Sequence, residues 1–129
     1  MTLTGNDSTS APALSDVIDT AHLARYTMGD VKLERELLGM FDVQLRELLT
    51  ALEKARGDVR AWKLAAHTLK GAARAVGAFP LAETALALEK EGPSAPDVLM
   101  ERLKRQAGDF RKAWMHWRES RAGGLQQAG

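Results

Sequence analysis

The residues best suited to chemistry lie between positions 60 and 74, where a histidine is flanked by cations. Side chains three and four residues apart share a helix face, and this spacing relates Arg60, Lys63, His67, Lys70 and Arg74. Neighbouring cations favour the neutral form of an imidazole, which keeps a ring-nitrogen lone pair available for attack. The same cations would stabilise a dianionic phosphoryl group once it is attached. A neutral nucleophile among cations therefore suits the acceptance of a phosphoryl group.

Gly71 lies one helical turn beyond His67. Glycine costs a helix interior about 1 kcal/mol relative to alanine, so its presence in an alanine-rich segment needs a reason. Helical side chains tilt toward the N-terminus, and a side chain at position 71 would lean back over the His67 ring. We expect Gly71 to leave the approach to that ring open.

The run His67-Thr68-Leu69-Lys70-Gly71, with Gly77 six residues after Gly71, resembles the signature of histidine-containing phosphotransfer (HPt) domains. The resemblance extends over about residues 15–118. It implies a helical bundle whose exposed histidine accepts a phosphoryl group from a receiver-domain aspartate or from a kinase and passes it on. By this resemblance His67 is the phosphorylated residue, Lys70 is the cation beside the phosphoryl group, and Gly71 provides clearance.

Further site residues follow from the same resemblance. Some HPt domains place Glu or Gln on the next helix to accept a hydrogen bond from the other ring nitrogen, and counting without gaps gives Glu89. Glu89 also continues an apolar helix face, where a charge needs a reason. Lys63 and Arg74 are supporting candidates for contact with the phosphoryl group or the receiver. Many relatives carry a neutral residue at the position of Arg74 and small hydroxyl residues where this chain has Ala72 and Ala73.

Composition restricts the chemistry to histidine and carboxylate groups. The 129 residues include no Cys, which excludes disulfides, Cys-ligated zinc, iron–sulfur clusters and thiol nucleophiles. Lys and Arg number 18 against 17 Asp and Glu, a formal net charge of +1, whereas dedicated nucleic-acid binders are usually strongly basic. This length suits a single domain with a substantial core.

The elements that position these residues are predicted to be helices. The chain has 21 Ala but only six Val and a single Ile, and strands favour β-branched residues. We expect an all-α fold, an antiparallel up-down four-helix bundle with a short additional N-terminal helix. The predicted helices run from about Ser15 to Tyr26, Asp30 to Arg56 and Asp58 to Val76, then from Pro80 to a stop at Gly92-Pro93, and last from a capping box at Ser94-Ala95-Pro96-Asp97. Residues 15–121 would form the domain, between flexible tails at 1–14 and 122–129.

Other functions fit the sequence less well. Asp19 and His22 have the spacing of a metal-binding pair, but a di-iron bundle needs more such units; we interpret His22 and His116 as bystanders. The last helix has a basic excess, yet its interleaved aromatic residues fit an amphipathic bundle helix better than a DNA-binding one. A degenerate HPt-like bundle that acts only as an interaction module, and a purely structural bundle, remain the alternatives.

The resemblance also implies partners. We expect response-regulator receiver domains and a sensor (hybrid) histidine kinase as partners, with no nucleic acid and no membrane, and a monomeric, cytoplasmic protein. No nucleotide-binding glycine loop is present, so the chain would be a phosphorelay carrier rather than an autonomous kinase. It would hold no cofactor, and Mg²⁺ would lie on the receiver.

Overall fold

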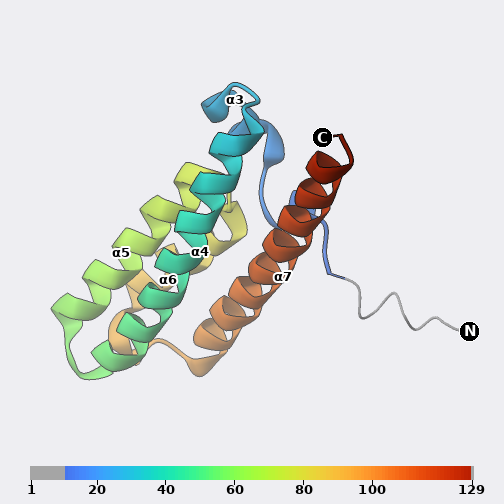
Figure 1. Ribbon diagram of the computed structural model, residues 1–129. Coiled ribbons are helices and arrows are strands. Elements are labelled where there is room, and N and C mark those ends of the chain that lie inside the picture. The colour runs from blue at the N-terminus through green and yellow to red at the C-terminus, as the bar shows by residue number, and fades with distance from the viewer. Residues whose placement is uncertain (1–10, 129) are drawn as a thin grey trace, which may run out of the picture.

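The computed structural model describes the backbone of residues 11–128 and the side chains of residues 11–120, and within this part the chain forms helices and turns but no strand. The all-α prediction is confirmed. The elements are α2 (Leu14–Val17), α3 (Thr20–Thr27), α4 (Val31–Lys54), η1 (Ala55–Gly57), α5 (Val59–Val76), α6 (Phe79–Glu91), η2 (Gly92–Ser94) and α7 (Asp97–Ala128). Short turns make α4, α5 and α6 reverse direction, so that α5 packs against both α4 and α6, and α7 lies along α4 and α6 (Figure 1).

Local capping signals fix the ends of the two central helices. The Asp30 carboxylate accepts a hydrogen bond from the backbone N–H of Leu33, and the Asp58 carboxylate accepts one from that of Ala61. A side-chain oxygen at the N-cap satisfies an N–H group that the helix cannot. Both caps stand where the sequence predicts them, and Gly77 ends α5 in the left-handed conformation, with φ of 86°.

The core fills the space between the long helices. Leu38, Leu45 and Leu52 of α4 are fully or almost fully buried. Phe41 of α4 meets Phe110 of α7 edge to face, with 5.0 Å between ring centroids. The end of α5 is tied to the N-terminal segment, because Asp19 donates its backbone N–H to the Gly77 carbonyl.

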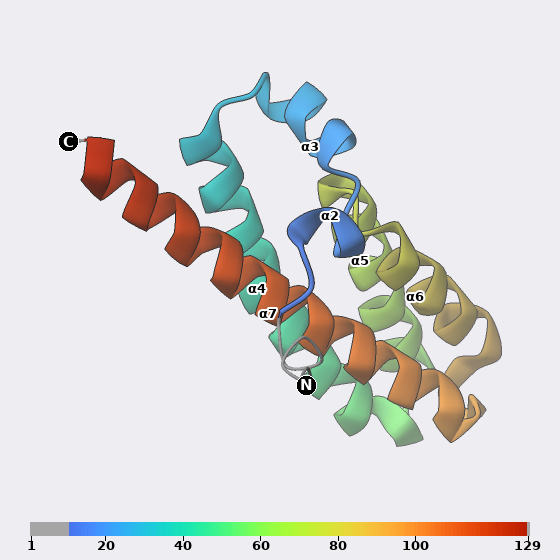
Figure 2. The same ribbon diagram turned by 90° about the vertical axis from the view of Figure 1, so that its right-hand side faces the viewer.

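The predicted N-terminal helix is wrong in one respect, because two short helices replace it. Ile18 interrupts the helix with extended backbone (φ −134°, ψ 160°) and is buried. Asp19 then caps α3 by accepting from the His22 N–H. The break lets α2 pack against α7 while α3 covers the end of the bundle where α4 begins and α5 ends (Figure 2).

Three further boundaries differ from the expectation. Ser94 belongs to η2, and α7 begins only at Asp97, so the capping box predicted from Ser94 does not open this helix. The backbone of α7 continues as helix to Ala128, through the Gly-rich residues predicted as a tail. At the other end Leu14, the last residue of the predicted N-terminal tail, is buried in the core, and residues 1–10 of that tail lie outside the described part.

Among residues 11–128 no helix is both long enough and apolar enough to span a membrane.

Candidate functional site

The site lies between the middle of α5 and the last turn of α6. Trp62 is fully buried, and its indole N–H donates to the Leu88 carbonyl at 2.8 Å. Leu69 and Ala66 of α5 and Ala85 of α6 are likewise fully buried. This packing fixes the rotation and height of α6 against α5, and it places Glu89, the residue after Leu88, beside the exposed face of α5.

His67, Glu89 and Lys70 form one hydrogen-bonded group. Glu89 Oε2 lies 3.1 Å from His67 Nδ1, and Glu89 Oε1 accepts from Lys70 Nζ at 2.7 Å. The His67 side chain is 65% exposed, whereas those of Glu89 and Lys70 are 24% and 15% exposed. The structure thus brings together the three residues that the sequence singled out on two helices.

The electrostatics of this group determine which ring nitrogen carries the proton. The hydrogen bond from Lys70 is the main cause that lowers the pKa of Glu89 below its ordinary value near 4.5; burial opposes the shift and the His67 contact adds to it. An ionised carboxylate can only accept hydrogen bonds. The Nδ1 atom of His67 must therefore be the donor, and in the neutral ring the lone pair resides on Nε2.

The surroundings of Gly71 are open. Apart from its two chain neighbours and the backbone of its own helix, a Cβ atom added at this position would meet no heavy atom of the described part within 4 Å. A methyl group would therefore not touch the His67 ring, contrary to the simplest form of the sequence argument. Any clearance that Gly71 provides concerns a molecule arriving from outside.

Lys63 and Arg74 are exposed on the same face, one turn before and two turns after His67. Among residues 11–120 neither side chain forms an ion pair, in contrast to Lys70. The group at His67 therefore contains Lys70 and Glu89 but not Lys63 or Arg74.

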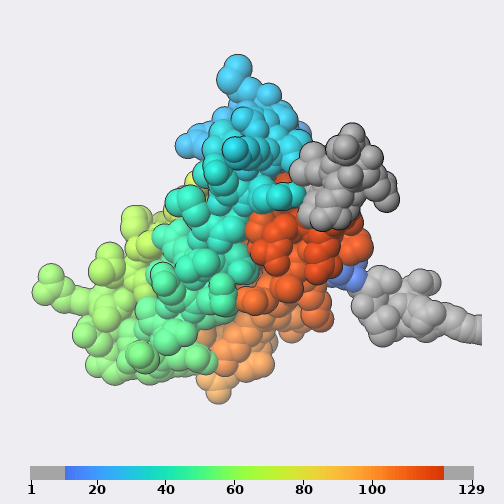
Figure 3. Space-filling view, viewed as in Figure 1, coloured from blue at the N-terminus to red at the C-terminus, as the bar shows by residue number. Residues whose placement is uncertain are grey.

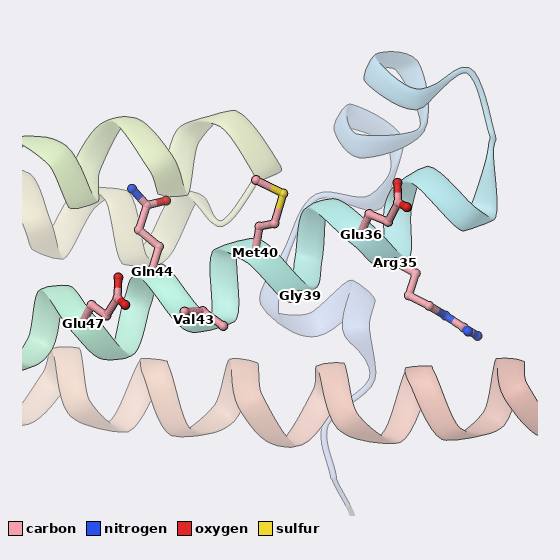
Figure 4. A pocket seen from close by; sticks show the side chains of 7 residues that line it. All are labelled: Arg35, Glu36, Gly39, Met40, Val43, Gln44 and Glu47. Atoms are coloured by element: carbon pink, nitrogen blue, oxygen red, sulfur yellow. The ribbon is translucent and has the colours of Figure 1, made fainter.

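Apolar side chains are exposed on both α4 and α5. Leu64, one turn before His67, is 67% exposed, and Met40 of α4 is 68% exposed. Helices α4 and α5 lie side by side on one face (Figure 3). Met40 and Gln44 project from α4 toward α5, and they line a shallow groove of about 910 Å³ (Figure 4). The remaining lining residues are Arg35, Glu36, Gly39, Val43 and Glu47. Sequence reasoning did not identify this groove, although Met40 and Val43 lie off the helix face that carries buried Phe41 and Leu45, and apolar residues at such positions are a signal that could have found it.

The other histidines have different surroundings. His22 Nε2 lies 3.2 Å from the Ala75 carbonyl, and its ring packs edge to face on Phe79. This contact, with the Asp19–Gly77 bond, fastens α3 to the end of α5. His116 is exposed on α7. Within the described residues no three His, Asp or Glu side chains cluster as metal ligands, and Asp19 acts as a helix cap.

A match to a known protein family shows the family to which the chain belongs. The Hpt domain family matches residues 36–113, which is more than half of the chain. The chain belongs to the Hpt domain family. No curated protein and no solved structure matches the chain. The matched range of this Hpt domain contains His67, Lys70, Gly71 and Glu89, whereas α2 and α3 precede it. Membership implies a phosphotransfer role in two-component signalling, in which Hpt domains interact with receiver domains and kinases.

Proposed function

We propose that this Hpt domain relays a phosphoryl group through His67, between receiver-domain aspartates or from a sensor kinase to a response regulator. The observation that supports this most directly is the contact between His67 Nδ1 and Glu89 on a ring that is 65% exposed. One nitrogen is held by the protein and the other is left for a partner. The chain would be a carrier in a phosphorelay and not an autonomous kinase.

The transfer step follows from this geometry. The Nε2 lone pair attacks the phosphorus of an aspartyl phosphate on the receiver; the N–P bond forms, and the P–O bond breaks with its electron pair leaving on the aspartate. The proton on Nδ1 stays in place, so the ring gains positive charge during the transfer. The Glu89 carboxylate stabilises that charge. Return of the phosphoryl group to a second receiver reverses the same steps.

We further propose that the helices form the antiparallel up-down bundle of the family. The protein would be a cytoplasmic monomer that binds neither a cofactor nor nucleic acid. Mg²⁺ would be held by the receiver and would supply charge neutralisation at the phosphoryl group. Leu64, Met40 and the groove on α4 would receive the receiver, while Lys63 and Arg74 would contact it at the edge.

A transfer assay tests the proposal. A receiver domain labelled with ³²P on its aspartate is mixed with the chain, and acid-labile, alkali-stable label is sought on the chain. We expect label on the wild-type protein and on His116→Gln, which removes an exposed histidine far along the sequence, but none on His67→Gln. Label on His67→Gln would refute the assignment. Binding of receivers without any label would favour the alternative, an interaction module that is not phosphorylated.

A further inference from the structure

The position of Lys70 differs from what the family resemblance implies. The resemblance places this lysine beside the phosphoryl group, yet its ammonium is 2.7 Å from Glu89 Oε1 and its side chain is only 15% exposed. The cation is therefore already engaged with a carboxylate, and it is largely covered. A phosphoryl ligand would need an ammonium group that reaches solvent next to the ring.

The angular position of Lys70 around the axis of α5 also argues against contact with a phosphoryl group. At 100° per residue, Lys70 is turned by about 60° to one side of His67 and Gly71 by about 40° to the other. Lys70 leans toward α6, where Glu89 lies, and this is also the side that Nδ1 faces. In an imidazole ring Nε2 points away from Nδ1, so Nε2 faces away from α6, on the side where Gly71 leaves open space.

We infer that Lys70 is a positioning residue that acts through Glu89, and that it does not bind the phosphoryl group. Lys70 holds one carboxylate oxygen, so that the other oxygen of Glu89 is fixed where it accepts the Nδ1–H of His67. The arrangement keeps the lone pair on Nε2. This inference rests on the proposed function for its rate measurements, but the effect on the ring can be observed without any transfer.

The surroundings of Glu89 support a positioning role for Lys70. The buried hydrogen bond from Trp62 to Leu88 sets the height of α6 at this point, but it leaves the rotamer of Glu89 undetermined. A glutamate side chain with three rotatable bonds loses considerable entropy when it is fixed, and its bond to Lys70 offsets that cost. The same bond is the main cause of the lowered pKa of Glu89, which keeps the carboxylate in its accepting form.

The first measurement is the tautomer of His67, read from its ¹⁵N chemical shifts in the unphosphorylated protein. We expect the Nδ1–H tautomer to predominate in wild type and to decrease in both Lys70→Met and Glu89→Gln. Lys70→Arg, which keeps a cation that can reach Glu89, should restore most of it. Lys90→Met is the matched control, because Lys90 adjoins Glu89 in the sequence but is exposed and makes no ion pair within residues 11–120. An unchanged tautomer in Lys70→Met would overturn the inference.

The second measurement is a double-mutant cycle on the transfer rate. Since Lys70 acts through Glu89, Lys70→Met should slow phosphoryl acceptance about tenfold in wild type but less than twofold in the Glu89→Gln background. Equal slowing in both backgrounds would mean that Lys70 binds the phosphoryl group directly, and the inference would be wrong. Thermal unfolding of each variant identifies any that fails to fold, and Lys70→Gln, which also removes the cation, then replaces Lys70→Met.

The two proposals fail in distinguishable ways. If no variant accepts phosphate from any receiver while the tautomer responds as expected, the proposed function is wrong and the positioning role stands. If transfer occurs but the two substitutions act additively, the proposed function stands and the role of Lys70 is refuted.

Discussion

At the scale of single residues, Glu89 would contribute to the proposed transfer because it contacts Nδ1, the ring nitrogen that does not react in it. Replacing it with Gln keeps the size of the side chain but removes its charge. A hydrogen bond to a charged group contributes about 1.5–3 kcal/mol, so we expect Glu89→Gln to slow phosphoryl acceptance by about 10- to 100-fold. Rapid-quench transfer from a labelled receiver measures the rate. A rate within twofold of wild type would contradict the role given to this carboxylate.

The lowered pKa of Glu89 predicts a pH dependence of stability. A carboxyl group whose pKa is lower in the folded than in the unfolded protein stabilises the fold above the unfolded value, and this contribution disappears as pH falls through the folded value. The difference in unfolding free energy between wild type and Glu89→Gln should therefore be constant above about pH 5.5, where the unfolded carboxyl is ionised, and shrink at more acidic pH. Urea unfolding from pH 7 to pH 3 measures it. A difference that grew on acidification would show the opposite sign of shift.

Gly71 allows stability and transfer to be separated. Because a Cβ atom there meets open space, Gly71→Ala should stabilise the protein by about 0.8–1 kcal/mol through helix propensity. If the open space is needed by an incoming receiver, the same variant should accept phosphate about tenfold more slowly, since one methyl group in a tight contact costs about 1–3 kcal/mol. Urea unfolding and the transfer assay together check this. A stabilised variant with the wild-type rate would mean that the clearance has no function.

The orientation of the Lys70 side chain toward Glu89 could not be predicted from the sequence. The spacing of Lys70 and Gly71 from His67 predicts which side chains share a face, and counting along α6 points to Glu89, which lies beside the His67 ring. Whether Lys70 turns to a phosphoryl group or to Glu89 depends on the gap between two helices. That gap is set by the packing of Trp62 against Leu88, which is a contact between distant parts of the chain.

At the scale of elements, the helix starts at Asp30 and Asp58 could be predicted because a cap is a local interaction between residues three apart. The break at Ile18 could not, because it depends on the hydrogen bond from Asp19 to Gly77, which joins parts of the chain 58 residues apart. Helix propensity favours continuing the helix through this point. Burial of Ile18 and the long-range bond outweigh it.

Gly77 should be the glycine most sensitive to substitution at this scale. Its φ is 86°, and a Cβ atom there would lie 2.9 Å from the Asp19 carbonyl oxygen. A left-handed conformation alone costs an L-residue about 1–2 kcal/mol, so Gly77→Ala should destabilise the protein by more than about 2 kcal/mol. The matched control is Gly108→Ala, where a Cβ atom meets nothing within 4 Å among the described residues, and which should be neutral or stabilising. Denaturant unfolding of both variants measures the difference, and equal stabilities would contradict the strain.

At the scale of the whole molecule, the exposed apolar side chains of α4 and α5 should dominate receiver binding. Truncating a central apolar contact commonly costs more than 1 kcal/mol, whereas charges at a rim contribute less. We expect Met40→Ala and Leu64→Ala each to weaken binding to a receiver about fivefold or more, and Arg74→Gln less than threefold. Calorimetric titration at two salt concentrations measures this. If high salt abolished receiver binding while both truncations left it unchanged, charged contacts would dominate the binding and the prediction would be wrong.

The near-neutral charge of the whole chain conceals how charge is distributed within it. The segment from Arg56 to Arg74 has five basic residues and one acidic residue, and the structure neutralises this excess only in part, because Lys70 pairs with Glu89 while Lys63 and Arg74 have no such partner within residues 11–120. Net charge alone could not predict this. In the proposed transfer these two cations would attract a negatively charged phosphoryl donor toward the face that carries His67.

The 65% exposure of the His67 side chain has a consequence for signalling fidelity. A phosphoryl group on this ring would be exposed to solvent and accessible to other proteins, including phosphatases. Within the part of the chain that the structure describes, the His67 ring is largely uncovered, and in the proposed relay partners would be discriminated by how they dock around it. The lifetime of the phosphohistidine would then depend on competition among partner proteins for this exposed phosphoryl group. Changes in the concentrations of those partners would alter that lifetime without any change in this protein.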